Sequence, residues 1–318
     1  MDIVACTDEG FVMPTGVMMY SVCVNNKETD ITFHVVTNGV TQEDKRKLSD
    51  TVSRFGGGKS IVFYDTNELN TSVIPPMEKD ALLTVTTYYR LFLTELLPSD
   101  LKKVLYLDGD IINRKSLMPL WETDVDNFAV AASPDACFMD DSFYERLNYP
   151  KEKGYFNAGV LLINLEYWRK NNFINSFKEY IKQNADRLKW HDQDVLNYLL
   201  KDCKKIIPVK YNLMNLFLWS NRNYDDIIKK EIEEAINDCV LLHFTPVKPW
   251  YTTCQHPFRS TFFKYQAQTI WKDTPLIEKR PLSWRIKKLL GWGFRKLHLL
   301  PELPPYSKQF MDGLTPIN

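Results

Sequence analysis

The sequence predicts an α/β protein with a mostly parallel central sheet that helices cover on both faces. Two observations lead to this prediction. Short apolar runs rich in β-branched residues recur along the first part of the chain, and segments with helical signals separate them. Strands that alternate with helices form parallel sheets, because a helical crossover returns the chain to the same end of the sheet. At 318 residues the chain can bury one large core or two modest ones.

The first half of the chain contains four of these runs. Strands are predicted over Asp2 to Thr7, Ile31 to Val36, Ser60 to Tyr64 and Lys103 to Leu107. Helices are predicted over Pro14 to Val24, from Thr41 onward, and over Thr86 to Leu97, where Pro98 ends the helix. Thr41 with Asp44 three residues later is typical of a capped helix start.

The second half is less regular and ends in a basic segment. Strands are predicted over Asn157 to Asn164 and Cys239 to Leu242, and helices over Glu166 to Asn184, Asp192 to Leu200 and Asp225 to Ile236. We therefore expect a catalytic domain over residues 1–273 and an extension over residues 274–318. Between Lys279 and Pro301 the sequence has seven Lys and Arg and no acid, interleaved with aromatic residues. This pattern suits adsorption to an anionic membrane, and the alternative is an ordinary basic helix packed on the domain.

Composition excludes several classes of protein. Forty basic residues balance forty acidic ones, so no global field favours a nucleic-acid partner. The N-terminus has no secretory signal, and no stretch approaches the roughly 18 apolar residues that span a bilayer. Six scattered cysteines without a CxxC pair predict reduced thiols and a cytoplasmic location. The segment Phe55 to Ser60 contains a GKS tripeptide, but we expect a flexible turn rather than a phosphate loop, since Ser53 stands where such a loop needs glycine and the segment leads into a strand.

Acidic residues follow two of the predicted strands. Asp8 follows the first strand, and Asp108 and Asp110 follow the fourth. Ligands of parallel sheets bind beyond the carboxyl ends of the strands, so all three acids are expected on one rim. In Asp108-Gly109-Asp110 the two carboxylates can converge and then repel unless they share a proton or a cation. A bound Mg²⁺ or Mn²⁺ ion would neutralise the two carboxylates and remove this repulsion. The alternative is a turn with two solvated aspartates.

A histidine and a lysine follow the last predicted strand. His243 can supply a nitrogen ligand, and mixed nitrogen and oxygen ligation favours Mn²⁺ over Mg²⁺. Lys248 precedes Pro249 and can contact a phosphate as a point charge. The alternatives are a partly buried histidine with satisfied hydrogen bonds and a surface lysine.

Three further groups of polar residues stand at predicted element starts. His191-Asp192-Gln193-Asp194 opens a helix, where acids cap the N-terminus or bind a hydroxyl-rich ligand. Asn157 stands at a strand entrance and can meet the same ligand. Arg90 can clamp a phosphate or a carboxylate, or form a structural ion pair.

Six motifs in order carry a family resemblance. They are DIVACTDEGF, TTYYRLFL, KVLYLDGDIINRKSLMPLW, YFNAGVLLINLEYWR, HDQDVLN and HFTPVKPW, and they span residues 1 to about 250. The chain resembles the retaining glycosyltransferases of family 8, most closely their bacterial lipopolysaccharide galactosyl- and glucosyltransferase branch. The resemblance implies a single-domain, Rossmann-like GT-A fold and transfer of a hexose from a UDP-sugar to a glycan acceptor. If that acceptor is a lipid-linked glycan, adsorption of the basic segment to a membrane predicts a location at the inner face of the plasma membrane.

The resemblance also assigns site residues. The family's metal ligands fall on Asp108, Asp110 and His243, and its phosphate lysine falls on Lys248. Other donor-binding positions fall on Cys6, Thr7, Asp8, Phe11, Arg90, Gly109, Asp135 and Asn157. The sugar-supporting positions Asp192 and Gln193 are the expected catalytic residues.

The chain departs from the family pattern at two places. Gly10 and Phe11 stand where close members often have Asn and Tyr, so base stacking can persist but a tyrosine hydroxyl contact cannot. Pro246 replaces a glycine whose backbone N–H approaches the diphosphate, and proline has no N–H to donate.

The resemblance leaves the mechanism and two other functions open. Gln193 is an amide and a poor nucleophile, so we expect same-face attack, in which the leaving phosphate accepts the proton of the acceptor hydroxyl. A glycogenin-like self-glucosylating protein and an inactive sugar-nucleotide-binding protein are the alternative functions.

Overall fold

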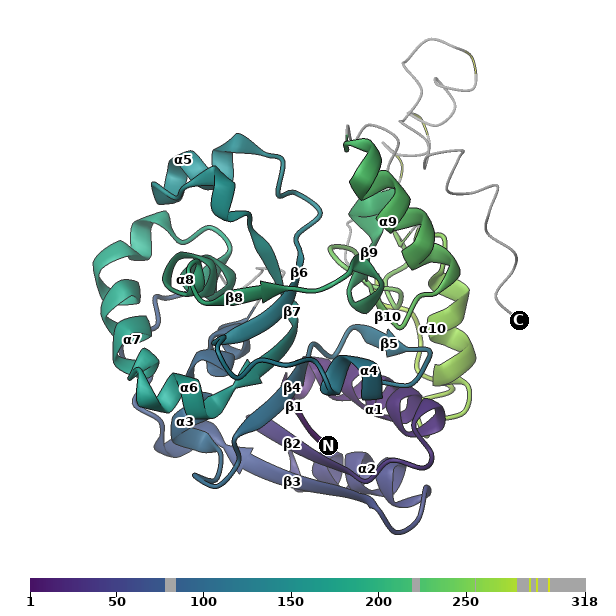
Figure 1. Cartoon of the computed structure of the whole chain (residues 1–318). Helices are drawn as coiled ribbons and strands as arrows, with labels where there is room; N and C mark the ends of the chain where they lie inside the picture. Colours follow the sequence, from purple (N-terminus) through teal and green to yellow (C-terminus); the bar gives the residue numbers. More distant parts are fainter. Residues whose placement is uncertain are drawn as a thin grey trace.

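The computed structural model describes residues 1–77, 84–218, 224–254 and 256–278, together with residues 286, 290 and 297. At its centre lies a seven-stranded sheet with the strand order β3-β2-β1-β4-β7-β6-β8 (Figure 1). Every strand pairing in this sheet is parallel except the two that β7 makes. The mostly parallel sheet that the sequence predicts is therefore confirmed.

The four strands of the first half lie where the apolar runs place them. They are β1 (Asp2–Asp8), β2 (Ile31–Asn38), β3 (Lys59–Asp65) and β4 (Lys103–Leu107). The interior positions of β1, β2 and β4 are almost continuously buried, because helices cover both faces of a parallel sheet. The glycines before β3 form the predicted turn, since the chain leads from them into a strand.

Strand β7 (Phe156–Asn164) runs against its neighbours β4 and β6 (Val130–Pro134). Because it is antiparallel, β7 begins at the edge of the sheet where β1 and β4 end. Asn157 therefore joins the same rim as the acids that follow β4. Strand β8 (Lys204–Ile206) closes the sheet beside β6, and the sequence did not predict either β6 or β8.

One face of the sheet packs against η3 (Val85–Phe92), α3 (Leu93–Leu96), α6 (Leu165–Lys170), α7 (Phe173–Asn184) and α8 (His191–Leu200). The helix predicted over Thr86 to Leu97 is wrong for its first part, which is a 3₁₀ helix. The guanidinium Nε of Arg90 donates to the carbonyl of Thr87 at 3.0 Å, so this carbonyl is already engaged by the side chain. The β-branched run Val85-Thr86-Thr87 also disfavours an α-helix.

A second correction concerns the helix predicted over Glu166 to Asn184. It is two helices, because the chain breaks at Asn172, which adopts a left-handed backbone with φ of 51°. Asparagine tolerates this conformation better than most residues.

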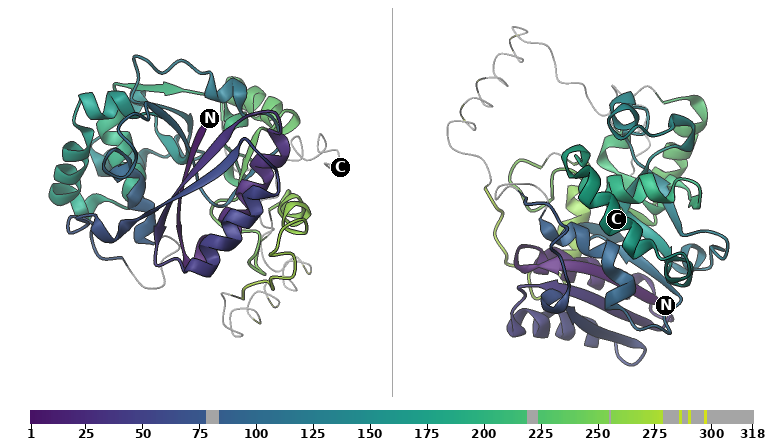
Figure 2. Two further views of the ribbon diagram at one scale, coloured as in Figure 1. Left: turned by 90° about the horizontal axis from the view of Figure 1, so that it is seen from below. Right: turned by 90° about the vertical axis from the view of Figure 1, so that its left-hand side faces the viewer.

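The opposite face packs against α1 (Val12–Asn25), α2 (Gln42–Ser53) and α4 (Met118–Trp121). Figure 2 shows the purple α1 on one side of the sheet and the teal α6 to α8 on the other. The hydroxyl of Thr41 accepts from the backbone N–H of Asp44 at 3.1 Å, which confirms the predicted cap of α2.

A small second sheet with the order β5-β10-β9 stands beside the large one. It consists of β5 (Ile111–Asn113), β9 (Leu213–Met214) and β10 (Leu241–His243), and it packs with α9 (Asp226–Asn237) and α10 (Arg259–Gln266). The predicted final strand thus belongs to this sheet, not to the central one. Because β10 pairs antiparallel with β5, His243 lies opposite Ile111, directly after Asp110.

Shorter elements connect these layers. They are α5 (Asp141–Leu147), η1 (Glu9–Phe11), η2 (Thr66–Glu68), η4 (Lys151–Lys153), η5 (Ala185–Arg187), η6 (Val209–Tyr211) and η7 (Asn215–Leu218).

The chain still pairs with the domain just past residue 274. The backbone N–H of Ile277 donates to Trp250 at 2.8 Å, and its carbonyl accepts from Thr252 at 3.1 Å. The predicted boundary between domain and extension stays a prediction. Apart from three single positions, the basic segment over residues 279–318 lies outside the described residues. No helix within the described part of the chain has the length and apolar character to cross a bilayer.

Candidate active site

A cavity of about 260 Å³ opens at the carboxyl ends of β1 and β4. Nearly all of the predicted site residues line it: Cys6, Asp8, Phe11, Arg90, Asp108, Gly109, Asp110, Asp135, Asn157, Asp192, Gln193, His243 and Lys248. The exception is Thr7, which is buried and whose hydroxyl accepts from that of Thr15 at 3.2 Å. Residues from distant parts of the sequence therefore meet at one rim.

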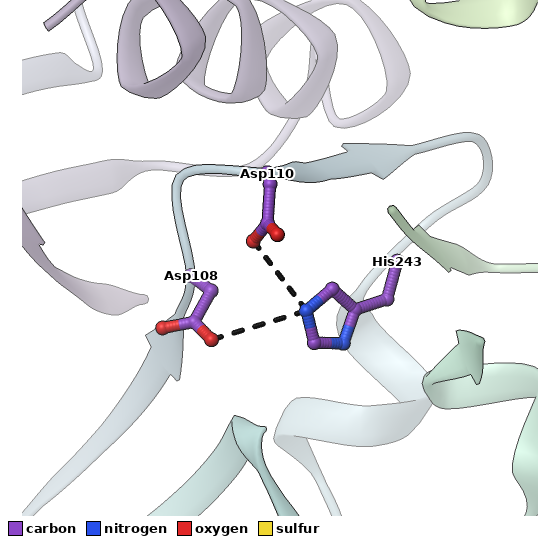
Figure 3. A group of neighbouring side chains, drawn as sticks. All are labelled: Asp108, Asp110 and His243. Carbon is purple, nitrogen blue, oxygen red and sulfur yellow. Dashed lines mark ion pairs between the residues drawn. The ribbon is translucent and has the colours of Figure 1, made fainter. Parts of the chain in front are cut away.

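Asp108, Asp110 and His243 form a compact group of ligand atoms. Their side chains point toward one another (Figure 3), and one ligand atom from each lies within 4.8 Å of the others. His243 Nε2 lies 3.4 Å from Asp110 Oδ1 and 3.9 Å from Asp108 Oδ2. Two carboxylates and one imidazole are a donor set that suits Mn²⁺ and also accepts Mg²⁺.

The surroundings of His243 fit a cation as well. Its Nδ1 lies 2.8 Å from Asn212 Oδ1, so Nε2 faces the two carboxylates with its lone pair. Gly159 provides the necessary space, because a Cβ atom there would lie 2.4 Å from His243 Cε1 and 2.9 Å from Asp108 Oδ2. Only glycine allows the strand to approach both ligands this closely.

Lys248 supplies positive charge next to these ligands. Its ammonium forms a buried ion pair with Asp110. Burial alone would raise the pKa of Asp110, but the ammonium of Lys248 outweighs this effect and holds the pKa below its ordinary value. Asp110 is therefore ionised at neutral pH, as a metal ligand must be.

Arg90 links two of the acids. Its guanidinium lies 3.0 Å from Asp108 Oδ1 and 2.9 Å from Asp192 Oδ2, and it also donates to the carbonyl of Ala158. It stacks over the ring of Tyr106, 4.4 Å from the ring centroid. Burial opposes the charge of Arg90, but the two carboxylates outweigh it and raise the pKa of the guanidinium. Arg90 therefore forms the ion pairs with other residues of the protein that the sequence predicts as one alternative, and it also lines the cavity, where a ligand would bind.

Asp192 is buried at the base of the cavity. Burial raises the pKa of this carboxyl to about 6, although Arg90 and a hydrogen bond from Thr87 act in the opposite direction. A carboxyl group whose charge is this incompletely compensated is a recognised feature of functional sites.

Asp135, Asn157 and Gln193 form a hydrogen-bonded cluster beside Asp192. Asn157 Nδ2 donates to Asp135 Oδ2 at 3.0 Å and to Gln193 Oε1 at 3.1 Å. Gln193 Nε2 donates to Asp135 Oδ2 at 3.2 Å, and its Oε1 also accepts from the backbone N–H of Ala158 at 2.9 Å. These contacts fix the orientation of Gln193 from both ends.

Residues at the end of β1 form another part of the cavity wall. Asp8 Oδ2 accepts from the hydroxyls of Thr84 and Thr86 at 2.6 and 3.0 Å. Phe11 packs edge-on against Trp250 with ring centroids 5.7 Å apart. Cys6 is buried, and burial raises the pKa of its thiol to about 12, so it is a neutral thiol.

The loop after β4 is tightly packed, and the loop after β10 contributes Pro246 to the cavity wall. A Cβ atom on Gly109 would lie 2.6 Å from Thr15 Oγ1 and 3.3 Å from Phe11 Cδ1. Glycine at position 109 therefore lets the backbone between Asp108 and Asp110 pack closely against Thr15 of α1.

Sequence reasoning missed two residues that shape this site. Asn212 lies in an irregular loop, and no pattern in the sequence distinguishes it. Gly159 had a weak signal, since a glycine inside a buried strand indicates close approach of another group. Both depend on packing between elements far apart in the sequence.

A family model described as glycosyl transferase family 8 matches residues 2–254. General stress protein A of Bacillus subtilis is 28% identical over 85% of this chain and 94% of its own length. A lipopolysaccharide 1,2-glucosyltransferase of Escherichia coli is 27% identical over 96% of this chain and 86% of its own.

A solved structure shares both the fold and much of the sequence pattern. The galactosyltransferase LgtC, in complex with donor and acceptor sugar analogues, superposes with a TM-score of 0.74 at 29% identity. The match covers 90% of this chain and 100% of that one. The described architecture is therefore the GT-A fold that the sequence predicts.

Proposed function

We propose that this chain, which belongs to glycosyl transferase family 8 and is a glycosyltransferase, moves galactose or glucose from a UDP-sugar to a hydroxyl of a glycan. We further propose that the reaction retains the anomeric configuration and depends on a divalent cation. One observation carries this proposal: Asp108, Asp110 and His243 converge at the rim of a cavity beside a buried lysine.

The residues of the triad fit a resident cation. Asp110 is ionised, His243 directs Nε2 at both carboxylates, and Gly159 leaves room for the approach. A cation held there supplies positive charge beside the departing diphosphate, where negative charge develops. Mn²⁺ is the preferred ion, with Mg²⁺ as a substitute, because one of the ligands is nitrogen.

Lys248 and the wall formed by β1 accommodate the nucleotide. The ammonium of Lys248 is a point charge that reaches a phosphate oxygen while Asp110 keeps it in place. Cys6, Asp8 and Phe11 also line the cavity, where Phe11 offers a ring face for the base and Asp8 a carboxylate. Thr7 contributes its backbone, since its side chain is turned into the core.

A second group of cavity residues, Arg90, Asp135, Asn157, Asp192 and Gln193, accommodates the hexose and is called the sugar-binding wall. Arg90, Asp135 and Asn157 present polar groups to the hydroxyls of the hexose. Asp192 and Gln193 stabilise positive charge on the sugar ring as the diphosphate departs. The amide of Gln193 already bonds to Asp135 and Ala158, which suits an orienting group and disfavours a nucleophile. We therefore keep same-face attack, with the leaving phosphate accepting the proton of the acceptor hydroxyl.

The acceptor is proposed from the relatives. Two of the proteins that the chain resembles are a lipopolysaccharide 1,2-glucosyltransferase and a lipopolysaccharide 1,3-galactosyltransferase. We propose lipopolysaccharide or another cell-surface glycan as the acceptor class. A lipid-linked acceptor agrees with the basic, aromatic segment over residues 279–318, which we propose binds the cytoplasmic face of the plasma membrane. Liposome flotation of the full chain tests this, with Lys287→Gln and Lys288→Gln expected to reduce binding.

The donor and the cation are tested together. The purified chain is incubated with labelled UDP-galactose or UDP-glucose and a lipopolysaccharide core acceptor, with Mn²⁺ or with chelator. We expect label on the acceptor only with Mn²⁺, and a loss of at least about a hundredfold for Asp110→Asn. Label on the protein itself would favour self-glucosylation. Transfer that chelator leaves unchanged would contradict the metal-dependent reaction.

A further inference from the structure

The strongest unassigned feature of the site is Asn212, a fully buried residue between η6 and β9. It bonds to His243 on one side and to Asn157 on the other. We propose that Asn212 is a positioning residue: it fixes the neutral tautomer of His243 that leaves Nε2 free for the cation, and it connects the cation site to the sugar-binding wall. This inference rests on the proposed function.

The orientation of the two amides follows from a backbone donor. The N–H of Gly159 donates at 2.9 Å to the side-chain atom of Asn157 that faces it, so this atom is the oxygen Oδ1. The same oxygen lies 2.9 Å from Asn212, which must donate to it through Nδ2. The remaining atom of the Asn212 amide, which faces His243, is therefore the acceptor Oδ1.

The orientation of Asn212 in turn fixes the imidazole. An amide oxygen 2.8 Å from His243 Nδ1 requires the proton on Nδ1. In the neutral ring, Nε2 then carries the lone pair, and Nε2 is the nitrogen that faces Asp108 and Asp110. Hydrogen bonds of this kind hold metal-binding histidines in one tautomer and one orientation.

The same chain of contacts reaches the sugar-binding wall. Because Asn157 Oδ1 is committed to Gly159 and Asn212, its Nδ2 faces Asp135 and Gln193. A change at Asn212 therefore disturbs both the imidazole and the group that orients Gln193. Asn212 does not line the cavity itself, so it acts through its neighbours.

The chain offers a matched control for a purely structural role. Asn113 in β5 is equally buried, donates to the carbonyls of Lys115 and Val240, and accepts from Asn26. Asn113→Leu removes an equally buried amide without touching His243. It separates loss of stability from loss of the cation site.

The experiment uses the full chain with MnCl₂ and no nucleotide. Mn²⁺ binding is measured by electron paramagnetic resonance and calorimetry, alongside urea unfolding. We expect Asn212→Leu to weaken Mn²⁺ binding about ten- to a hundredfold. Asn212→Asp keeps an acceptor for Nδ1–H, so its Mn²⁺ affinity should stay within about threefold of the wild type. Asn113→Leu should lower stability but leave Mn²⁺ affinity unchanged.

A second measurement needs no variant of Asn212. Nitrogen-15 correlation spectra of the metal-free wild type report which ring nitrogen of each histidine is protonated, and His243→Gln identifies the signal of His243. We expect a proton on Nδ1 of His243, whether or not Nε2 also carries one while no cation is bound. A ring without a proton on Nδ1 would overturn the inference, even if Asn212→Leu fails to fold.

The remaining outcomes separate this inference from the proposed function. If the wild type binds Mn²⁺ and Asn212→Leu binds it equally well, the inference fails and the cation site stands. Equal losses for Asn212→Leu and Asn113→Leu would also overturn it. If the wild type binds no Mn²⁺, the proposed cation site fails, and the inference fails with it.

Discussion

Two aspartates at the start of α8, Asp192 and Asp194, are both buried and both paired with an arginine, but they differ in their position relative to the cavity. Asp192 pairs with Arg90 and lines the cavity, whereas Asp194 pairs with Arg146 outside it. In an α-helix each residue turns by about 100°, so positions two apart point to nearly opposite sides. One turn of helix thus places one acid at the cavity and the other in an ion pair outside it.

The two carboxylates differ in how completely they are satisfied. Asp194 accepts two bonds from Arg146 at 2.8 and 2.9 Å, one from the hydroxyl of Tyr155 at 2.6 Å and one from the N–H of Trp190 at 2.7 Å. Asp192 pairs with Arg90 and accepts from Thr87, but burial outweighs these contacts and leaves its pKa raised. Both acids pair with an arginine, so what distinguishes Asp192 is its incompletely compensated charge beside the cavity, and on this difference we base its proposed role.

The largest expected effect comes from breaking the ion pair outside the cavity. Asp194→Asn should lower the free energy of unfolding by about 3 kcal/mol, because the four hydrogen bonds that this buried carboxylate accepts, two of them from the half-buried Arg146, lose a charged acceptor. Activity per folded molecule should stay within about threefold of the wild type. Urea unfolding and initial rates on the same preparation check both. A large loss of activity at unchanged stability would assign Asp194 to the site and remove the contrast.

Asp192→Asn should show the opposite pattern. We expect kcat/KM to fall at least about a hundredfold, or roughly 2.7 kcal/mol of barrier, since a neutral amide stabilises positive charge on the sugar far less than a carboxylate does. The free energy of unfolding at pH 7 should fall by no more than about 1 kcal/mol. Asp194→Asn is the matched control in the same assays. Full activity of Asp192→Asn would contradict its catalytic role.

The sequence alone could predict part of this contrast. The acids at the start of α8 indicated both helix capping and ligand binding. In the structure Asp194 accepts from the backbone N–H of Trp190 at the helix start, and Asp192 lines the cavity. The rim formed by β1 and β4 was also predictable, because parallel strands end together. These inferences use local pattern and strand direction, both of which a sequence carries.

The remaining features depend on contacts that no local pattern encodes. The reversed direction of β7 brings Asn157 to the rim, and the pairing of β10 with β5 brings His243 beside Asp110. Each of these features is decided by tertiary packing, which overrides the helix and strand propensities of the segment itself.

The pH dependence of stability sharpens the comparison. The folded pKa of Asp192, about 6, lies above its unfolded value of 3.8, so its contribution is fully present below pH 3.8 and is lost as pH rises through 6. Relative to Asp192→Asn, the wild type should lose about 1.5 kcal/mol of unfolding free energy between pH 4.5 and 6. Urea unfolding with chelator present checks this. Parallel curves for the two proteins would contradict the raised pKa.

Glycine substitutions extend the contrast between site and framework to the backbone. In Gly159→Ala the new Cβ would press on His243 and Asp108, so the triad must open, and we expect Mn²⁺ affinity to fall about tenfold, or 1.4 kcal/mol. Gly57→Ala is the control, because open space surrounds that position and it needs no left-handed backbone. Calorimetric titration with MnCl₂ distinguishes the two variants. Unchanged Mn²⁺ affinity in Gly159→Ala would mean that His243 and Asp108 can move aside for a methyl group without loss of the cation site. The short distance from Gly159 to these two residues would then not be needed for cation binding.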